Sequence, residues 1–231
     1  MFIASFATGP WQANCYLIRR DTAPETVVID PGVDAADVVK GVLDEHGWTL
    51  AGVLCTHGHV DHIAEAALLA NQSEVPMWLH SADDYMLTTP SAGIGADSVP
   101  LMKQLFGADE LPAPTRREDL KGVASLEIAG ITFQVTHTPG HTPGCVVFTV
   151  TDDRGDAEGD IAFVGDLVFA GSIGRTDLPG GDPARMTRSL REVVLSWGDA
   201  TKLLPGHGEI TALGRERTVN PYLQPRFLEV A

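Results

Sequence analysis

The segment CTHGHVDH, residues 55–62, carries three of the eight histidines of this chain within six positions. Each imidazole has two ring nitrogens that need partners once the side chain is buried, so histidines are seldom crowded together for packing alone. Residues 51–57, AGVLCTH, predict a buried strand, and residues 64–72, AEAALLANQ, predict a helix. The three histidines therefore lie where a strand ends and a helix begins, a position at which a rigid sheet can hold polar side chains in a cleft.

Three more polar residues follow predicted strands elsewhere in the chain. His141 comes after a strand at 131–136, and Asp166 and His207 come directly after apolar β-branched or leucine-rich runs, FVG and LLPG. Glycines flank all of these positions and permit tight turns and a close approach of the backbone. The sequence thus indicates that several strand ends converge on one site.

The residue types in this set are those that bind divalent metals. Imidazole and carboxylate donors suit zinc, iron or manganese rather than a thiolate structural site. Seven donors are too many for one tetrahedral ion and suit two ions. The candidate ligands are His57, His59, Asp61, His62, His141, Asp166 and His207.

Composition limits the other possibilities. The 231 residues are 44% hydrophobic with a formal net charge of −15, so we expect one globular domain spanning 1–231 and no affinity for nucleic acid or anionic membranes. No apolar run approaches the ~20 residues of a membrane span, no secretory leader is evident, and the three cysteines lack a CxxC spacing. We expect a cytoplasmic protein with a small-molecule substrate. A monomer is compatible with the sequence, which leaves the oligomeric state open.

Both halves of the chain alternate short strands with helices, which indicates an α/β protein in which sheets pack on each other under outer helices. Residues 34–47 predict a helix with Asp34 as N-cap, Gly47 as its end and Val38 among the core-facing residues. Residues 126–138 predict a hairpin that turns at Ala129 and Gly130. Residues 88–119 predict a long excursion with one helix near VPLMKQLFG, either a pocket rim or a solvated connection.

Four motifs together resemble the metallo-β-lactamase-fold hydrolases, and most of all the short glyoxalase II enzymes, the hydroxyacylglutathione hydrolases. They are THGHVDH, TPGHTPG, GSIGRTDLPGGD (171–182) and LPGHGEITALGRERTVNPYL (204–223). The first is specific for the superfamily, and the last two narrow the subgroup. The resemblance implies an αββα sandwich of two mixed β-sheets flanked by helices, with the metal site at the sheet edge.

The resemblance also implies a division of the ligands. His57, His59 and His141 would hold one metal, Asp61, His62 and His207 the other, and Asp166 would bridge the two. Asp30, in VVIDPG, matches an early acidic position of the superfamily and is expected to orient ligand imidazoles through hydrogen bonds. Zinc is the favoured metal, iron and manganese are alternatives, and no organic cofactor is expected.

The implied activity is hydrolysis of a thioester of a small thiol, as in the conversion of an S-2-hydroxyacylglutathione to a 2-hydroxy acid and the thiol. A hydroxide that bridges the two metals would attack the thioester carbonyl. Asp61 and Asp166 are assigned catalytic roles, because they would offset the metal charge and fix the direction of the hydroxide.

The main alternative is a mononuclear Fe(II) persulfide dioxygenase, a class with the same fold whose two-His, one-Asp triad is present here as His57, His141 and Asp166. The sequence after the last histidine, EITALGRERTVNPYL, resembles the hydrolases instead. A β-lactamase, a metallo-nuclease and a non-enzymatic metal-binding module rank lower.

Several other polar residues are interpreted as structural. Arg175 is expected to pair with an aspartate of its loop, and Arg215 and Arg217 are expected on an exposed helical face. His80 and His137 are interpreted as hydrogen-bonded polar neighbours, and Cys55 and Cys145 as small apolar groups.

Overall fold

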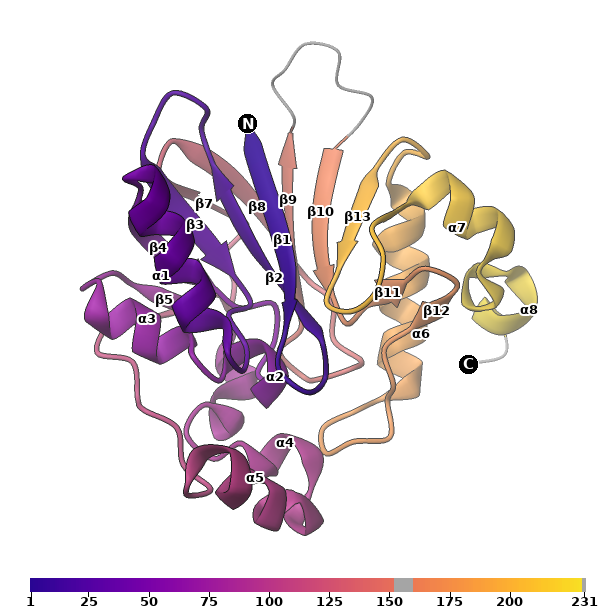
Figure 1. Cartoon of the computed structure of the whole chain (residues 1–231). Coiled ribbons are helices and arrows are strands. Elements are labelled where there is room, and N and C mark those ends of the chain that lie inside the picture. Colours follow the sequence, from indigo (N-terminus) through magenta and orange to yellow (C-terminus); the bar gives the residue numbers. More distant parts are fainter. Residues whose placement is uncertain (152–159, 230–231) are drawn as a thin grey trace.

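The computed structural model describes residues 1–151 and 160–229. Two six-stranded sheets face each other, with helices on their outer sides (Figure 1). The first sheet has the order β1-β2-β3-β4-β5-β6; its strands are β1 (Phe2–Thr8), β2 (Ala13–Arg19), β3 (Glu25–Ile29), β4 (Thr49–Leu54), β5 (Met77–Leu79) and β6 (Arg117–Asp119). Strands β1 to β3 pair antiparallel, and β3 to β6 pair parallel.

The second sheet has the order β14-β13-β10-β9-β8-β7 and is also mixed, because β10 pairs parallel with β13 and antiparallel with β9. Its strands are β7 (Ser125–Ile128), β8 (Ile131–His137), β9 (Val146–Thr151), β10 (Asp160–Gly165), β13 (Lys202–Pro205) and β14 (Thr211–Ala212). A separate hairpin joins β11 (Val168–Phe169) to β12 (Ser172–Ile173).

Helices cover both outer faces and one end of the molecule (Figure 1). They are α1 (Ala35–His46), α2 (Val60–Ile63), α3 (Ala66–Gln72), α4 (Ser91–Ile94), α5 (Val99–Phe106), α6 (Pro183–Glu192), α7 (Leu213–Val219) and α8 (Pro225–Leu228). Short 3₁₀ helices are η1 (Ser81–Met86), η2 (Ala96–Ser98), η3 (Val194–Ser196) and η4 (Pro221–Leu223). The predicted αββα sandwich is confirmed.

The core between the sheets is built from the inward residues of both. Phe133, Phe148 and Phe163 of the second sheet are buried against Ile18 and Leu54 of the first. Phe133 and Phe148 meet edge to face with ring centroids 6.3 Å apart. Two further clusters pack α1 and α3 on the first sheet, and α6, α7 and α8 on the second. Three apolar layers therefore fix the relative position of the strands.

The local predictions were mostly confirmed, with two corrections at the first helix. Asp34 stands at the N-cap position of α1, but its side chain makes no cap hydrogen bond, and the Glu65 carboxylate instead accepts from the amide of Ala36. Val38 is 42% exposed rather than core-facing, since Val39 and Leu43 supply the buried stripe. Gly47 ends the helix in the left-handed conformation as predicted, with φ of 65°.

The other local predictions concern turns and the long excursion. Ala129 and Gly130, with φ of 53° and 69°, form the turn between β7 and β8. The excursion contains the predicted helix as α5, and α4 precedes it. The polar turn expected at 151–159 lies, apart from Thr151, outside the described residues. Within the described ranges, none of the helices has the length and apolar character needed to cross a bilayer.

The inter-sheet core yields a stability prediction. Replacement of Phe148 by alanine removes a fully buried ring and leaves a cavity between the sheets, so we expect the free energy of unfolding to fall by about 3–5 kcal/mol. Denaturant unfolding measures this quantity. The matched control is Val38→Ala, whose side chain is 42% exposed, for which we expect a change within about 0.5 kcal/mol. Similar losses for the two variants would contradict the assignment of the core.

Candidate metal centre

Four of the candidate ligands lie in one short segment that follows β4 and runs into α2. His57 and His59 precede α2, and Asp61 and His62 lie within it. His59 occupies the N-cap position of this helix and Asp61 lies in its first turn, where the Asp61 carboxylate is 3.1 Å from the Nε2 atom of His207. The amide of His62 donates to the carbonyl of His59, which closes the turn on which all four side chains are carried.

The other three candidate ligands follow strands of the second sheet. His141 comes after β8, Asp166 directly follows β10, and His207 follows β13 after the intervening Gly206. Backbone contacts draw these ends together, because the amide of Gly206 donates to Gly165 and its carbonyl accepts from Asn14 on β2. A side chain on Gly206 would overlap the Asp166 carboxylate and the His62 ring, so this approach requires glycine.

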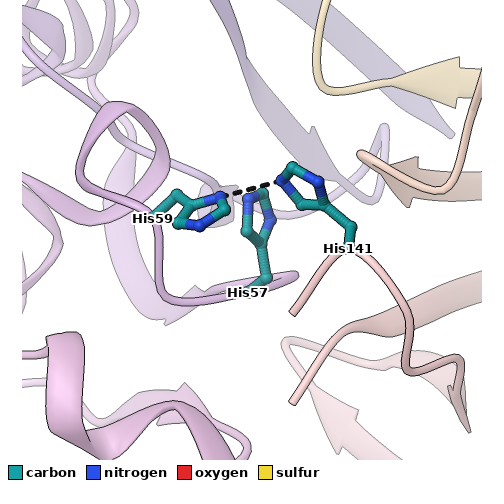
Figure 2. Close-up of side chains that lie close together, drawn as sticks. All are labelled: His57, His59 and His141. Carbon is teal, nitrogen blue, oxygen red and sulfur yellow. Dashed lines mark hydrogen bonds between the residues drawn. The ribbon is translucent and has the colours of Figure 1, made fainter. Parts of the chain in front are cut away.

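Three buried imidazoles form the first cluster. His57, His59 and His141 each place a ring nitrogen within 4.8 Å of the others. Nδ1 of His59 lies 2.8 Å from Nε2 of His141, and the three rings point toward one another from two separate loops (Figure 2). The structure thus brings together the three residues expected at one metal.

Asp61, His62 and His207 form the second cluster, again with ligand atoms within 4.8 Å of one another. Nε2 of His62 lies 3.3 Å from Nε2 of His207 and 3.7 Å from an oxygen of Asp61. This cluster adjoins the first, since the ring centroids of His57 and His62 are 4.2 Å apart. The arrangement is consistent with two metal ions side by side.

Asp166 lies between the two clusters. Its Oδ1 is 3.4 Å from Nε2 of His62, and its Oδ2 is 3.4 Å from Nε2 of His141 and 3.7 Å from Nε2 of His207. One carboxylate oxygen therefore faces a member of each cluster, which is the placement that a bridging ligand needs.

The orphaned atoms of the site fit a metal. Nε2 of His57 and Oδ1 of Asp166 are buried without a hydrogen-bond partner. A buried polar atom left unpaired costs free energy, and such atoms in native proteins usually have an explanation. Divalent ions coordinated by these nitrogen and oxygen donors would satisfy them.

The pKa of His59 in the first cluster and that of His62 in the second shift in opposite directions. Burial and the neighbouring imidazole of His141 lower the pKa of His59 to about 3, so His59 offers a lone pair rather than a proton. Burial opposes the charged form of His62, but the carboxylates of Asp61 and Asp166 outweigh it and raise its pKa to about 10. Metal binding at the second cluster therefore has to displace protons, as metal binding commonly does.

Residues outside the two clusters hold the candidate ligand imidazoles in their orientations. Both oxygens of Asp30 accept from Thr56, by its amide at 2.7 Å and its hydroxyl at 2.6 Å, and Oδ2 also lies 3.1 Å from Nδ1 of His62. Asp30 lies close enough to His57 and His62 to be a ligand itself, but its oxygens are already engaged, which favours the orienting role expected from the sequence. Nδ1 of His141 and Nδ1 of His207 contact the carbonyls of Arg175 and Trp11, at 2.7 Å and 3.1 Å. Their Nε2 atoms thus face the clusters.

A cavity of about 390 Å³ opens onto the clusters. Its lining combines five of the candidate ligands with Arg175 and apolar side chains that the sequence analysis did not identify: Trp11, Ile94, Phe169, Ile173 and Leu178. Ile94 belongs to the 88–119 excursion, whose pocket-rim interpretation is thereby supported. These walls come from turns and short elements with no spacing pattern, so only tertiary structure assembles them.

The charged residues of the 171–182 motif are accounted for by loop contacts. Arg175 forms a bidentate pair with Asp177, with both N–O distances 2.7 Å, as the predicted Arg–Asp pair requires. Asp182 instead caps α6 by accepting from the amide of Arg185. Arg175 nevertheless lines the cavity, where its guanidinium is already neutralised.

The remaining histidines and cysteines stay outside the clusters. His80 and His137 stack on each other with centroids 4.3 Å apart, and each makes a hydrogen bond to the backbone, as expected of structural residues. Cys15, Cys55 and Cys145 are buried, and burial raises the pKa of each thiol. Neither group competes with the metal clusters as a catalytic site.

The run RERTVNPYL, residues 215–223, contacts the hairpin that forms one wall of the cavity. The buried Glu216 carboxylate accepts from the amide of Gly171 at 2.7 Å, and Asn220 Nδ2 donates to the carbonyls of Phe169 and Ser172 at 3.2 and 3.0 Å. Arg215 and Arg217, expected on an exposed face, bond to Glu216 and to the carbonyl of Trp197. The run therefore clamps the β11–β12 hairpin.

Residues 8–207 match the metallo-beta-lactamase superfamily, and the chain belongs to this superfamily. This match confirms the resemblance inferred from the motifs, and the chain is a metallo-hydrolase of this class.

Individual relatives are similar over the whole chain. The hydroxyacylglutathione hydrolase GloC of Haemophilus influenzae is 34% identical over 218 residues, which are 94% of this chain and 95% of that protein. The crystal structure of BLEG-1, a B3 metallo-beta-lactamase, is 32% identical with a TM-score of 0.82 and covers 96% of this chain and 100% of that chain. TTHA1623 in a di-iron-bound form is 33% identical with a TM-score of 0.74 and covers 95% and 100%.

The first prediction for the site concerns Asp166. Asp166→Ala removes the carboxylate that faces both clusters, so we expect metal affinity to fall by more than about 100-fold, beyond what loss of an outer-sphere partner causes. Elemental analysis after loading with zinc measures the change. The control is Asp160→Asn, an exposed aspartate at the other end of β10. Two tightly bound ions in Asp166→Ala would refute a bridging role.

The second prediction concerns Asn220. Asn220→Ala removes the donor to two hairpin carbonyls, so we expect faster amide hydrogen exchange in 168–173 and a loss of about 1–3 kcal/mol in stability, with unchanged metal content. The control is Thr218→Ala, an exposed residue of α7, the helix whose C-cap is Asn220. Hairpin exchange that stays as slow as in the parent protein would show that Asn220 does not hold this wall.

Proposed function

We propose that this protein hydrolyses thioesters of small thiols, with S-2-hydroxyacylglutathiones as the reference substrates. The observation that carries the proposal is the pair of adjoining ligand clusters, joined by Asp166, at the base of an apolar-walled cavity. Full-length similarity to the GloC hydroxyacylglutathione hydrolase supports the choice of substrate.

Two divalent ions, zinc by preference and iron or manganese as alternatives, would be held by His57, His59 and His141 and by Asp61, His62 and His207, with Asp166 shared. When bound, such ions lower the pKa of water and stabilise negative charge that develops on a carbonyl oxygen. The protein's own carboxylates act beside them. Asp166 faces both clusters and Asp61 faces His207, so they offset the positive charge and set the direction from which water reaches the substrate.

The protein supplies orientation and a low-dielectric wall. Thr56 and Asp30 hold His57 and His62 in place, and backbone carbonyls hold His141 and His207. Trp11, Phe169 and Ile173 are positioned to bury the acyl chain, and a cavity of about 390 Å³ accommodates a small acyl group. A thiolate is a good leaving group, so the reaction does not require a strong general acid.

The buried state of the cysteines agrees with this assignment. A cysteine nucleophile needs an exposed thiol with a lowered pKa, whereas burial raises the pKa of Cys15, Cys55 and Cys145. A covalent acyl-cysteine route is therefore not favoured by the described residues.

The test is a substrate panel combined with metal analysis. We expect hydrolysis of S-2-hydroxyacylglutathione and of acyl thioesters of other small thiols, loss of that activity after exhaustive chelation, and recovery when zinc, iron or manganese is returned. Free thiol released per minute measures the rate. The Asp166→Ala protein, prepared in parallel, controls for contaminating thioesterases.

Two outcomes would contradict the proposal. A protein that contains one iron per chain and consumes dioxygen with glutathione persulfide, without cleaving thioesters, is the dioxygenase. Opening of a cephalosporin or carbapenem without thioester cleavage would instead assign the activity named for the structural relative BLEG-1.

A further inference from the structure

A carboxylate outside the predicted ligand set lies beneath the first cluster. Asp83 belongs to η1, which follows β5, and it is fully buried. Its neighbour Asp84 is exposed and pairs with Arg117 at 2.5 Å. No arginine or lysine within residues 1–151 and 160–229 forms an ion pair with Asp83. A buried carboxylate without a cationic partner costs stability, so its presence calls for a compensating role.

The compensation comes from two loops. Oδ2 of Asp83 accepts from the amide of Gly58 at 2.9 Å and from the hydroxyl of Thr142 at 2.6 Å, and Oδ1 accepts from the amide of Gly144 at 2.7 Å. Gly58 stands between His57 and His59, and Thr142 directly follows His141. One carboxylate is therefore hydrogen-bonded to both loops that supply the first cluster.

These loops come from different sheets. The Gly58 loop leaves β4 of the first sheet, and the Thr142 loop leaves β8 of the second. In Figure 2, His57 and His59 approach from one loop and His141 from the other. Side-chain contacts such as the 2.8 Å approach of His59 to His141 join the two sets of rings, and beside them the amide of Val146 donates to the carbonyl of Thr56 at 2.8 Å. Asp83 adds a connection from its carboxylate to the backbone amides of both loops.

Both glycines are needed for this connection. A Cβ atom on Gly58 would lie 2.9 Å from Cβ of Asp83, and one on Gly144 would lie 2.6 Å from its Cγ. Any larger residue would push the loops away from the carboxylate. The glycines in THGH and HTPG thus permit close approach to Asp83, a contact that their motifs do not reveal.

We propose that Asp83 is a positioning residue that ties the His57–His59 loop to the His141 loop and thereby sets the geometry and affinity of the first metal cluster. All three of its contacts use the carboxylate as an acceptor, because each partner donates. An asparagine in its place would present an NH₂ group to at least one of these donors. The inference depends on metal binding by this cluster and not on which substrate the protein cleaves.

The test compares Asp83→Asn with Asp84→Asn, the exposed aspartate next to it. The metal-free proteins are titrated with Zn²⁺ against a chromophoric chelator and with Co²⁺ while the visible absorption spectrum is recorded. For Asp83→Asn we expect at least about a 10-fold weaker affinity for one of the two ions and an altered Co²⁺ spectrum, in the range typical for loss of a partner of a ligand. Asp84→Asn should match the parent protein in both readouts.

A purely structural role would lower the melting temperature of the metal-free protein while leaving the Co²⁺ spectrum and both affinities unchanged, and that result would overturn the proposal. If Asp83→Asn does not fold, Thr142→Val decides the question, since it removes one donor and keeps the size of the side chain. A shifted Co²⁺ spectrum in a folded Thr142→Val protein supports the proposal, and the parent spectrum with parent affinity refutes it. Because thioester cleavage is not a readout, failure here is distinguishable from failure of the proposed function.

Discussion

Burial of charged and titratable groups at one sheet edge is the constraint on which the rest of this structure depends. Five imidazoles and the carboxylates of Asp30, Asp61 and Asp166 share a small volume at the base of the cavity, and most of them are buried. Such a cluster is unfavourable unless each ring nitrogen and oxygen has a partner. Protons on the second cluster and hydrogen bonds to backbone carbonyls meet part of this need, and the unpaired atoms of His57 and Asp166 leave the remainder for cations.

The sandwich makes this concentration of polar groups tolerable. Three apolar layers hold the strands, so the loops at one end do not have to stabilise the fold. Close approaches then bring those loops together. Gly32 leaves room for the carbonyl of Asp61, and Gly206 leaves room for Asp166 and His62. Rigid sheets and small residues at the strand ends together achieve a precision that flexible loops alone would not.

The sequence predicted the candidate ligands, which lie in short motifs or after strands. It did not predict the residues that reach the site only through tertiary packing. His57 to His62 are recognisable because four donors share one short run, and the single donors at 141, 166 and 207 each follow an apolar strand. Trp11, Phe169 and Leu178 have no comparable sequence pattern. They line the cavity because the turn at Trp11 packs beside the segment that contains β11 and Leu178. The sequence SADDYM (81–86) does not indicate that Asp83 and Asp84 differ. In the structure, Asp83 is buried against the Gly58 and Gly144 amides, whereas Asp84 is exposed. The prediction that Val38 faces the core was wrong. The helix contains three valines, and its buried face includes Val39 and Leu43 but not Val38.

The clamp on the β11–β12 hairpin has a consequence for the cavity. Phe169 and Ile173 shape the space for the ligand, yet they are fastened by Glu216 and Asn220 through the hairpin's own main chain. Substitutions in the C-terminal run can therefore reshape this side of the cavity from a distance. The shape of the cavity is thus adjustable through a part of the chain that contributes none of the seven candidate ligands.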